Sequence, residues 1–445
     1  MMETIALSQA TNYVSQVVRI KGHLQGMRDL GQIIFLNVRD RAASIQVVVE
    51  NAQLLQQVRG LALETPCFFE GTMQARPGKS SSSGAIEATA ELVLTAITPL
   101  SPVTETCPIE IGKQSKIDGL SPQTLLDYRP LTLRNEKVRA IFKIEAEIVR
   151  AFRQYLDEQG FTEIHSSKLV STGTEGGAQL FAVDYFGRQA YLAQSPQFYK
   201  QIMVGAFERV YEVGPVYRAE EHDTSRHLNE YISLDFEMGF IQSEQDVIRM
   251  QIGLLRHIFA EVAGRCAKEF ALYGITLPQI ETIAQINLAE ARELLIKNYN
   301  WRPEPTVHDL DGEGERLLCA HFEKTEGLSM VYVTNYPHKI RPFYAMPGSE
   351  SAGELGSKSF DLLYGGLEIT TGGQRIHEYE RLTESMKNRG LNPDDFGDYL
   401  MAFKHGLPPH GGLAIGLERL AKQMLKLPSV KQTSLFPRDI NRLTP

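Results

Sequence analysis

The pattern of apolar residues changes part-way along the chain, and this change limits the folds that the sequence can adopt. Up to about residue 98 the apolar residues form short, β-rich runs that are separated by turn residues. From residue 135 they recur at helical spacing for more than twenty residues. A chain of 445 residues is also too long for one ordinary core. The sequence therefore predicts two domains of different construction, 1–100 and 135–445, joined by a hinge or linker over 101–134.

The first region has the order of elements expected for a small β-barrel. One short helix, AQLLQQVRGLA (52–62), is predicted between the third and fourth of five strands. The five predicted strands are QVVRIKGHLQ (16–25), GQIIFLNVRD (31–40), ASIQVVVE (43–50), CFFEGTMQ (67–74) and AIEATAELVLTAI (85–97). ARPGKSSSSG (75–84) is interpreted as a flexible hairpin tip. This order matches a five-stranded oligonucleotide-binding (OB) barrel.

The second region mixes long helices with strands, which predicts an α+β domain. NEKVRAIFKIEAEIVRAFRQYLDEQGF (135–161) and EQDVIRMQIGLLRHIFAEVAG (244–264) have apolar residues at helical spacing. Strand-like runs alternate with such helices: FERVYEVGPVYRAE (207–220), YISLDFEMGFI (231–241), MVYVTNYP (330–337) and FDLLYGGLEITTG (360–372). We expect an antiparallel sheet flanked by helices.

Composition narrows the class of protein. Charged residues make up 22% of the chain and the net charge is −8, which argues against broad binding of polyanions but permits local basic patches. No run of 18 apolar residues is present and the N-terminus lacks a basic segment followed by an apolar one, so we expect a cytoplasmic protein without a membrane span. Cys67, Cys107, Cys266 and Cys319 stand far apart, which favours free thiols over a zinc site or disulfides.

A charged run, RAEEHDTSRHLNE (218–230), stands between two predicted strands. Arg218 and Glu220 end the first strand on one face, because strand side chains alternate. The same alternation places four polar residues on one face of the second strand: Tyr231, Ser233, Asp235 and Glu237. Charged side chains on an otherwise apolar strand need partners. Those partners are either internal salt bridges or a charged ligand.

Two later segments favour a nucleotide ligand. Asp361, Glu368 and Arg375 follow one another at intervals of seven, and two carboxylates suit Mg²⁺ bridging substrate phosphates. HGGLAIGLERLAKQML (410–425) runs from glycines into a helix that carries Arg419, a combination that favours an anion. The chain has no GxxxxGK[ST] motif, so this is not a Walker-type site.

These segments, in this order, resemble the class II aminoacyl-tRNA synthetases. KVRAIFKIEAEIVRAFRQYLDEQGFTEIHSSKLV (137–170) is similar to the first motif of the family, which lies at the dimer interface; VYRAE (216–220) with RHLNEYISLDFEM (226–238) is similar to the second, and GGLAIGLERL (411–420) to the third. With the barrel, the resemblance covers nearly the whole chain. One departure is Ser167, which stands where the first motif usually has a proline and leaves the dimer geometry less secure. The resemblance implies a homodimer.

The resemblance also implies how ATP is held. Arg218 and Arg419 are the expected catalytic residues, with Arg218 on the α-phosphate. Glu220 would hold adenine and Tyr231 would stack on its ring, while Arg226, His227 and Arg419 would contribute to ATP binding at the phosphates. Asp361 and Glu368 would bind Mg²⁺. Activation is then an in-line displacement that depends on positioning and charge neutralisation rather than on a protein nucleophile.

Within this family, two segments resemble those of the aspartate enzymes. These are QSPQFYKQ (194–201) and STGTEGGAQLF (171–181), the latter similar to a mobile loop of the short archaeal and eukaryotic form. L-Aspartate differs from asparagine in its side-chain carboxylate, so its recognition calls for cations, here Lys200 and Arg375. The resemblance implies that Asp235 pairs with Lys200, that Gln197 adds hydrogen bonds and that Glu175 meets the α-ammonium group. Alternatives are an asparaginyl enzyme, a synthetase-like protein that does not acylate tRNA, and a plain single-strand-binding OB protein.

The barrel would read the anticodon of tRNA(Asp), and some members of this group also charge tRNA(Asn). Phe35 is expected to stack on an unpaired base, with Arg28 and Gln46 reading base edges. Alternation alone leaves open that Phe35 belongs to the barrel core. We hypothesise that His23 and Pro77 set the strictness towards the two tRNAs, without a direction.

Overall fold

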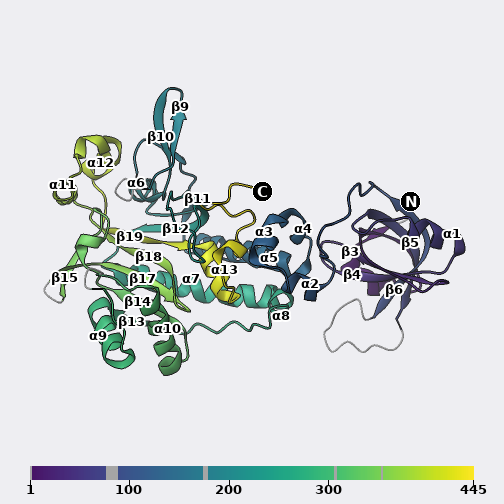
Figure 1. The fold of residues 1–445 in the computed structure, drawn as a ribbon. Helices are drawn as coiled ribbons and strands as arrows, with labels where there is room; N and C mark the ends of the chain where they lie inside the picture. Colours follow the sequence, from purple (N-terminus) through teal and green to yellow (C-terminus); the bar gives the residue numbers. More distant parts are fainter. Residues whose placement is uncertain (1–2, 77–88, 174–178, 305–307, 352–353) are drawn as a thin grey trace. The chain divides into compact units, whose positions relative to one another are not determined.

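The computed structural model describes residues 3–445 apart from 77–88, 174–178, 305–307 and 352–353 (Figure 1). The chain divides into two compact units, Met1–Leu120 and Ser121–Pro445. This division falls within the segment 101–134 that the sequence suggests as a linker. Each unit has a hydrophobic core of its own. The predicted hairpin tip (75–84) lies largely outside the described residues.

The smaller unit is a closed five-stranded barrel, as predicted. Strand β2 pairs with both β3 and β5, and β6 lies between β4 and β5, so the sheet closes on itself. The strands are β2 (Val17–Asp29), β3 (Ile34–Arg39), β4 (Ser44–Val49), β5 (Pro66–Ala75) and β6 (Ala90–Pro99); a short β1 (Thr4–Ile5) joins β2 in parallel and is followed by a 3₁₀ helix, Leu7–Tyr13. Helix α1 (Ala52–Arg59) connects β4 to β5 and begins at Asn51, whose side chain caps it. This order confirms the OB fold.

The larger unit is built on an eight-stranded sheet. Its order is β13 (Ala284–Asn287), β14 (Met330–Thr334), β17 (Ser359–Tyr364), β18 (Leu367–Arg375), β19 (His410–Gly416), β12 (Glu230–Gly239), β11 (Arg209–Tyr217) and β7 (Thr162–Glu163). Neighbours are antiparallel except for the pair at each edge, β13 with β14 and β11 with β7. The predicted antiparallel sheet with flanking helices is therefore confirmed.

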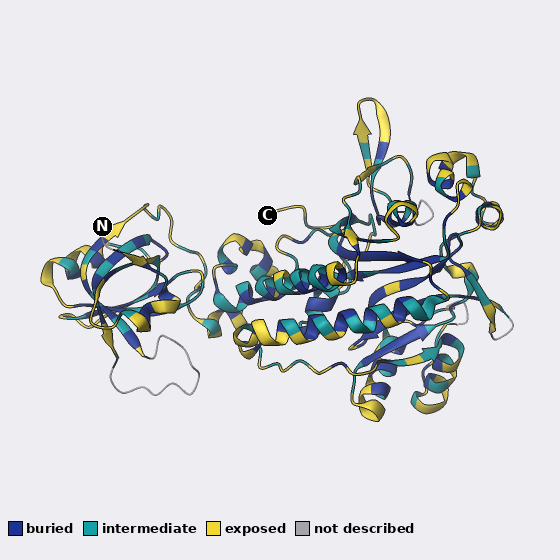
Figure 2. Cartoon of the chain, turned by 180° about the vertical axis from the view of Figure 1, so that it is seen from behind, coloured by how far each residue is buried: buried dark blue, intermediate teal, exposed yellow. Residues whose placement is uncertain are grey.

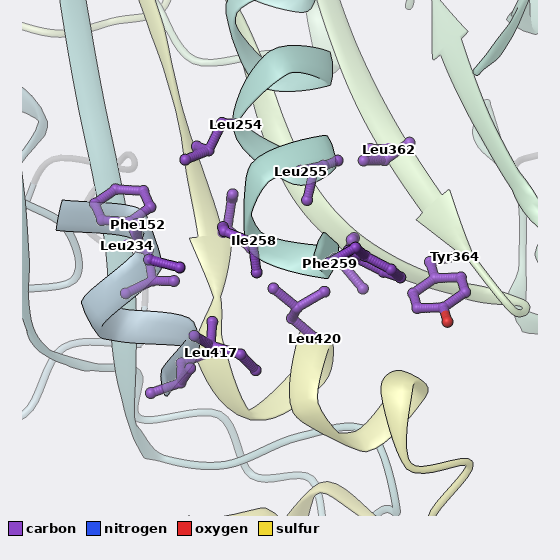
Figure 3. Packing of buried hydrophobic residues seen from close by; sticks show 14 of the residues in the cluster. Phe152, Leu234, Leu254, Leu255, Ile258, Phe259, Leu362, Tyr364, Leu417 and Leu420 are labelled. Atoms are coloured by element: carbon purple, nitrogen blue, oxygen red, sulfur yellow. The ribbon is translucent and has the colours of Figure 1, made fainter. Parts of the chain in front are cut away.

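Two long helices cover one face of this sheet (Figure 2). They are α5 (Glu136–Glu158) and α7 (Glu244–Arg265); Asn135 caps the first, and Ser243 forms a capping box with Asp246 at the second. Figure 3 shows where they meet the sheet and helix α13 (Leu417–Met424): Phe152 of α5 and Ile258 of α7 lie in the same cluster as Leu234 of β12. All three side chains are buried. This cluster leaves the opposite face of the sheet available for polar residues.

The remaining elements surround the sheet. Helices α9 (Leu288–Tyr299) and α10 (Gly312–Glu326) pack beside β13 and β14, and α6 (Gln197–Phe207) contacts β11 and β12 (Figure 1). The others are α2 (Gln114–Asp118), α3 (Pro122–Asp127), α4 (Arg129–Thr132), α8 (Ala267–Ala271), α11 (Tyr379–Asn388) and α12 (Gly397–Lys404); strands β8 (Leu169–Val170), β9 (Ala182–Tyr185) and β10 (Arg188–Leu192); the pair β15 (Pro347–Ser351) and β16 (Glu354–Ser357); and 3₁₀ turns at His338–Ile340, Pro393–Phe396 and Val430–Thr433.

Two segments differ from the pattern expected from the sequence. The run 360–372 is not one strand but a hairpin, because Gly365 and Gly366 adopt φ of 55° and 83° and reverse the chain. The glycine-rich stretch before Arg419 is the strand β19 in the middle of the sheet, so that helix α13 begins only at Leu417. Within the described part of the chain, no helix is long and apolar enough to cross a membrane. All four cysteines have free thiols.

Candidate active site

Strand β12 presents two chemically different faces. Leu234 and Phe236 belong to the core beneath α5 and α7, and the residues that alternate with them along the strand point to the other side of the sheet. There a cleft of about 600 Å³ opens, lined by Tyr231 and Ser233 of β12 among others. The lining residues come from the β11–β12 connection, β18, β19 and α13, as well as from the segment 340–345. The polar face predicted for β12 is thus the face that meets the cleft.

Four buried charges lie together beneath this face. The Lys200 ammonium group is 2.7 Å from the Asp235 carboxylate, 3.6 Å from that of Glu237 and 3.1 Å from the Leu413 carbonyl oxygen. The Arg375 Nε lies 3.0 Å from Glu237, and its Nη2 donates to the Gly412 carbonyl oxygen at 3.0 Å. Arg375 also lines the cleft, whereas Lys200 and Asp235 lie below it. We call these four residues, Lys200, Asp235, Glu237 and Arg375, the charged quartet.

The charged quartet depends on a glycine and an amide. A β-carbon at Gly412 would lie 2.1 Å from the Phe236 carbonyl oxygen and 2.3 Å from Glu237, so that any side chain there would displace the carboxylate. Gln197 lies between Glu237 (3.5 Å) and Arg375 (3.4 Å) and lines the cleft. Burial raises the pKa of Glu237, but Arg375 and Lys200 outweigh that effect and hold the pKa below its usual value. Glu237 is therefore ionised at neutral pH.

The start of the β11–β12 connection is fixed by Asn229. Its side-chain amide donates to the carbonyl oxygens of Arg218 (2.6 Å) and Glu220 (2.9 Å). Arg218 and Glu220 both line the cleft, and the Arg218 guanidinium lies 5.9 Å from the centre of the Tyr231 ring. One buried amide thus sets the backbone that carries two of the predicted ATP-binding residues.

Further along the cleft, cationic groups gather. Arg226, His227 and Arg419 line it together with Glu368. Arg419 donates to the Glu368 backbone oxygen at 2.9 Å, and its ion pair with the Glu368 carboxylate measures 3.4 Å. Burial, together with the charge of Arg419, lowers the pKa of His227, which leaves the imidazole neutral at pH 7. This part of the cleft offers two permanent cations to an anionic ligand.

Asp361 does not itself line the cleft. Both of its carboxylate oxygens bond to Arg341, at 3.0 Å and 2.6 Å, and Arg341 stacks over Tyr336 at 3.7 Å. Among the described residues, no three His, Cys, Asp or Glu side chains are grouped to hold a metal ion. The structure thus places Glu368 in the cleft wall, whereas Asp361 lies behind Arg341, which lines the cleft. Glu175, expected at the α-ammonium group, lies outside the described residues.

The barrel residues expected to read RNA lie on its outer surface. Ile34 and Leu36 are buried in the core, so that Phe35 between them points outward. Phe35 on β3 stands opposite Arg28 on β2, and Gln46 on β4 stands opposite Asn37 on β3. The Gln46 amide is held from both sides, by Glu91 (2.8 Å) and by Arg76 (2.9 Å). His23 lies on β2, and Pro77 falls outside the described residues.

The family follows from comparison with known proteins. Residues 121–440 match the family model for "tRNA synthetases class II (D, K and N)", and residues 18–100 match that for the "OB-fold nucleic acid binding domain". The chain belongs to the class II tRNA synthetases. In the synthetase, the anticodon-binding barrel precedes the synthetase domain, which is the order predicted from the sequence.

Relatives cover almost the full length of the synthetase. The aspartate–tRNA(Asp/Asn) ligase of Thermus thermophilus is 47% identical over 97% of this chain and 98% of the relative. The ligase of the same name from Aeropyrum pernix is 43% identical (96% and 95%), and the aspartate–tRNA(Asp) ligase of Thermococcus kodakarensis is 39% identical (97% and 96%).

Two solved structures have the same architecture. The asparaginyl-tRNA synthetase of Pyrococcus horikoshii, complexed with asparaginyl-adenylate, has a TM-score of 0.89 at 28% identity over all of both chains. The aspartyl-tRNA synthetase of Entamoeba histolytica has a TM-score of 0.87 at 29% identity and matches all of this chain and 93% of the other.

Sequence reasoning did not assign some residues that shape this site. Glu237 shares the predicted polar face of β12 and is the partner of both buried cations. The neighbouring sequence does not indicate the roles of Asn229 and Arg341. Asn229 acts through a contact with the backbone, and Arg341 through a contact with Asp361, 20 residues away. For Glu237 the strand alternation was a usable signal, since a fourth polar residue on that face needs a partner.

A buried histidine supports the charged quartet from behind. His410 Nδ1 is 2.9 Å from the Pro408 carbonyl oxygen, and Nε2 is 2.9 Å from the Gln201 amide, whose oxygen accepts a hydrogen bond from Tyr399. This arrangement fits a neutral ring that donates from Nδ1 and accepts at Nε2. Burial lowers the pKa of His410 to about 4, although the neighbouring Glu237 opposes this shift.

We expect His410 to make the synthetase domain lose stability in mild acid. The folded imidazole stays neutral down to about pH 4, whereas in the unfolded chain its pKa is the ordinary 6.5. Between these values the unfolded state binds more protons, so the free energy of unfolding falls as pH falls, by up to about 3 kcal/mol. Urea unfolding at pH 4.5 and 7.5, followed by the fluorescence of buried Trp301, the only tryptophan, measures this loss.

The control is His410→Gln, which keeps a donor and an acceptor but does not titrate. Its free energy of unfolding should change less between the two pH values than that of the unchanged synthetase. An equal change in both proteins would show that other groups cause the acid sensitivity.

Proposed function

We propose that the synthetase activates L-aspartate with ATP and transfers the aspartyl group to tRNA. The observation that carries this proposal is the charged quartet, which places the guanidinium of Arg375 at the cleft and the Lys200 ammonium group directly beneath it. A substrate carboxylate would meet fixed cations there, whereas a neutral amide would leave them less well paired. The names of relatives that are 39–47% identical support the same substrate.

In the first step, an oxygen of the aspartate α-carboxylate attacks the α-phosphorus of ATP. The bond to the oxygen that bridges the α- and β-phosphates breaks, and pyrophosphate leaves with that electron pair. Arg218 would stabilise the charge that grows on the α-phosphate, with Tyr231 and Glu220 on the adenosine side. His227, Arg226 and Arg419 would bind the leaving phosphates.

In the second step, a ribose hydroxyl of the terminal adenosine of tRNA attacks the aspartyl carbonyl carbon. AMP leaves with the electron pair of the broken C–O bond, and the hydroxyl proton passes to the leaving phosphate or to water. Among the described residues that line the cleft, no side chain is placed as an obligatory general base for this step, so we assign it to positioning.

Of the two expected Mg²⁺ ligands, Glu368 is better placed than Asp361. Glu368 lines the cleft and its carboxylate accepts a hydrogen bond from Thr371, which lines the cleft too, so these two residues offer oxygen donors of the type that Mg²⁺ takes. Asp361 does not fit as a direct ligand in this arrangement, because both of its oxygens bond to Arg341. A bound Mg²⁺ would supply positive charge to the phosphates alongside Arg226 and Arg419.

We propose that the synthetase charges both tRNA(Asp) and tRNA(Asn). The relatives from Thermus thermophilus and Aeropyrum pernix, at 47% and 43% identity, bear the name of that broader activity. In the barrel, the exposed face with Arg28, Phe35 and Gln46 supports an anticodon contact by stacking and base-edge hydrogen bonds. His23, close by on β2, remains our candidate for strictness.

We also propose a homodimer that uses the first motif. Strand β7 is an edge of the large sheet, and an uncovered edge offers unpaired backbone groups to a second copy. Ser167, which replaces the usual proline, is exposed, and its hydroxyl donates to the nearby Leu169 carbonyl oxygen at 2.9 Å. Sedimentation at micromolar concentration distinguishes a dimer from a monomer.

Pyrophosphate exchange with single amino acids tests the proposed substrate. We expect exchange with aspartate and at least a hundredfold lower kcat/KM with asparagine or lysine, because only the aspartate side chain brings a negative charge to the Arg375 guanidinium at the cleft. Aspartylation of purified tRNA(Asp) and tRNA(Asn) then measures the breadth of the second step. Charging of tRNA(Asp) alone would defeat the broader proposal and leave the first intact.

The second candidate is an asparaginyl enzyme, favoured by the likeness to the Pyrococcus horikoshii structure. Exchange that prefers asparagine would establish it and overturn the substrate assigned to Arg375 and Lys200. No exchange with any amino acid, in folded protein that binds ATP, would point instead to a synthetase-like protein without acylation activity.

A further inference from the structure

Helix α10 contributes an acidic residue to the phosphate end of the cleft. Glu315, on its first turn, accepts a hydrogen bond from Nη2 of Arg226 and forms an ion pair with it. The two residues are 89 positions apart in the chain, and Arg226 lines the cleft whereas Glu315 lies behind it. The pair therefore connects the β11–β12 connection to a helix that sequence reasoning left without a role.

The position of Glu315 is set by a well-packed helix. Leu318, Cys319 and Phe322 bury one face of α10 in a core that it shares with α9, β14 and Trp301. Asp311 caps the helix by accepting from the Gly314 backbone, and the Trp301 indole donates to the same carboxylate oxygen at 3.0 Å. A helix fixed at its end and along one face is a rigid support for a side chain on its first turn.

The guanidinium of Arg226 also lies against the backbone of α10. A β-carbon at Gly312 would be 2.4 Å from Arg226 Nη1, a separation that contacting atoms do not adopt. Gly312 is helical, so an alanine there strains no backbone angle but requires the guanidinium to move. Position 312 therefore reports on the placement of Arg226 independently of Glu315.

The charges around Glu315 explain why a carboxylate is useful there. Arg226 and Arg419 both line the cleft, and without a phosphate ligand their charges repel. Glu315 has only 13% of its side chain exposed, and burial raises its pKa to about 7, although Arg226 opposes this shift. A guanidinium has five N–H groups, so that binding one carboxylate through Nη2 does not exhaust its capacity for phosphate.

We propose that Glu315 is a positioning residue for ATP: it holds the Arg226 guanidinium through Nη2 and orients the rest of that group towards the terminal phosphates. This inference rests on the proposed ATP-binding function. Glu315 itself would not touch the nucleotide, because its carboxylate lies on the far side of Arg226 from the cleft. The gain is in preorganisation, since Arg226 enters the complex already in place.

The test compares ATP affinity and exchange kinetics at pH 8, where Glu315 is ionised, in Glu315→Gln, Gly312→Ala and the unchanged synthetase. We expect both variants to raise the Kd for ATP with Mg²⁺, and the KM for ATP in exchange, by about tenfold, which is the loss of one charge-assisted hydrogen bond. The KM for aspartate should stay unchanged and kcat should fall by no more than about twofold. Glu315→Asp, which keeps the charge, should restore part of the affinity.

Two further proteins make the result decisive. Glu313→Gln, an exposed carboxylate on the same turn, is the matched control and should bind ATP normally. In the double variant Arg226→Ala with Glu315→Gln, the Kd for ATP should be no higher than in Arg226→Ala alone, because Glu315 acts through Arg226.

Unchanged ATP affinity in both Glu315→Gln and Gly312→Ala would overturn the proposal. So would additive losses in the double variant, which would mean that Glu315 acts independently of Arg226. Binding is measured without the reaction, so a synthetase that bound ATP but failed to activate aspartate would contradict the proposed substrate while Kd still decided the role of Glu315. Trp301 packs beside α10, so its fluorescence verifies that each variant is folded.

Discussion

Replacing Arg218 by alanine is expected to lower kcat for aspartate-dependent pyrophosphate exchange by on the order of a thousandfold. The α-phosphate gains charge as the aspartate carboxylate attacks, and a fixed cation stabilises that state more than the ground state. Arg218 is well placed for this role, because Asn229 fixes its backbone and Tyr231 lies beneath its guanidinium. The KM for ATP should change much less than kcat, since the contact strengthens in the transition state.

Arg218→Lys separates charge from geometry. It keeps the positive charge but lacks the planar fork, so only part of the lost kcat should return. Arg249→Ala, which removes an arginine whose side chain is 68% exposed on α7, is the control and should leave kcat unchanged. A rise in KM for ATP at constant kcat in Arg218→Ala would mean that Arg218 only binds the substrate, and the catalytic role would be wrong.

Replacing Arg375 by alanine is expected to lower kcat/KM for aspartate by about a thousandfold or more, because a buried ionic site loses one member of each of two pairs. The substrate carboxylate loses the cation at the cleft, and Glu237 loses its strongest partner and keeps Lys200, 3.6 Å away. Exchange at graded aspartate concentrations gives kcat/KM, and calorimetric titration with ATP shows whether the nucleotide still binds.

Arg375→Ala with Glu237→Gln distinguishes the two losses. If much of the damage comes from the Glu237 carboxylate that has lost Arg375, the double variant should regain stability against urea but not activity with aspartate. Activity with aspartate within tenfold of normal in Arg375→Ala would contradict the assignment of this residue to the substrate carboxylate.

The sequence was informative wherever the chemistry is local to one element. The alternation of β12 predicted that Tyr231, Ser233, Asp235 and Glu237 share a face, and the structure has them facing the cleft or the charges beneath it. The barrel could also be predicted from the sequence, because apolar and polar residues alternate within each strand. The sheet closes into a barrel through the order in which the strands pair. The role of Lys200 was predicted from the resemblance of its segment to the aspartate enzymes and not from a hydrophobic pattern, because a lysine on a helix is ordinarily solvated.

Contacts between distant elements were not predictable in this way. Asp361 was expected at a metal, yet Arg341 from the segment before β15 takes both of its oxygens. The ion pair of Arg226 with Glu315 and the amide clamp of Asn229 depend on where helices and loops meet after folding. The sequence around a carboxylate does not indicate whether its partner is an arginine, a metal ion or water. Only the folded structure identifies the partner.

The charged quartet has as many positive as negative groups, and all four side chains are at most 8% exposed. Mobile ions screen exposed charges within about 10 Å at ordinary salt concentrations but reach buried pairs far less. Contacts to tRNA phosphates, by contrast, weaken steeply as the salt concentration rises, because binding releases condensed counterions and that release gains less free energy at high salt. We therefore expect ionic strength to affect the two substrates differently. High salt should weaken the binding of tRNA, while the selection of the amino acid by the charged quartet should change little.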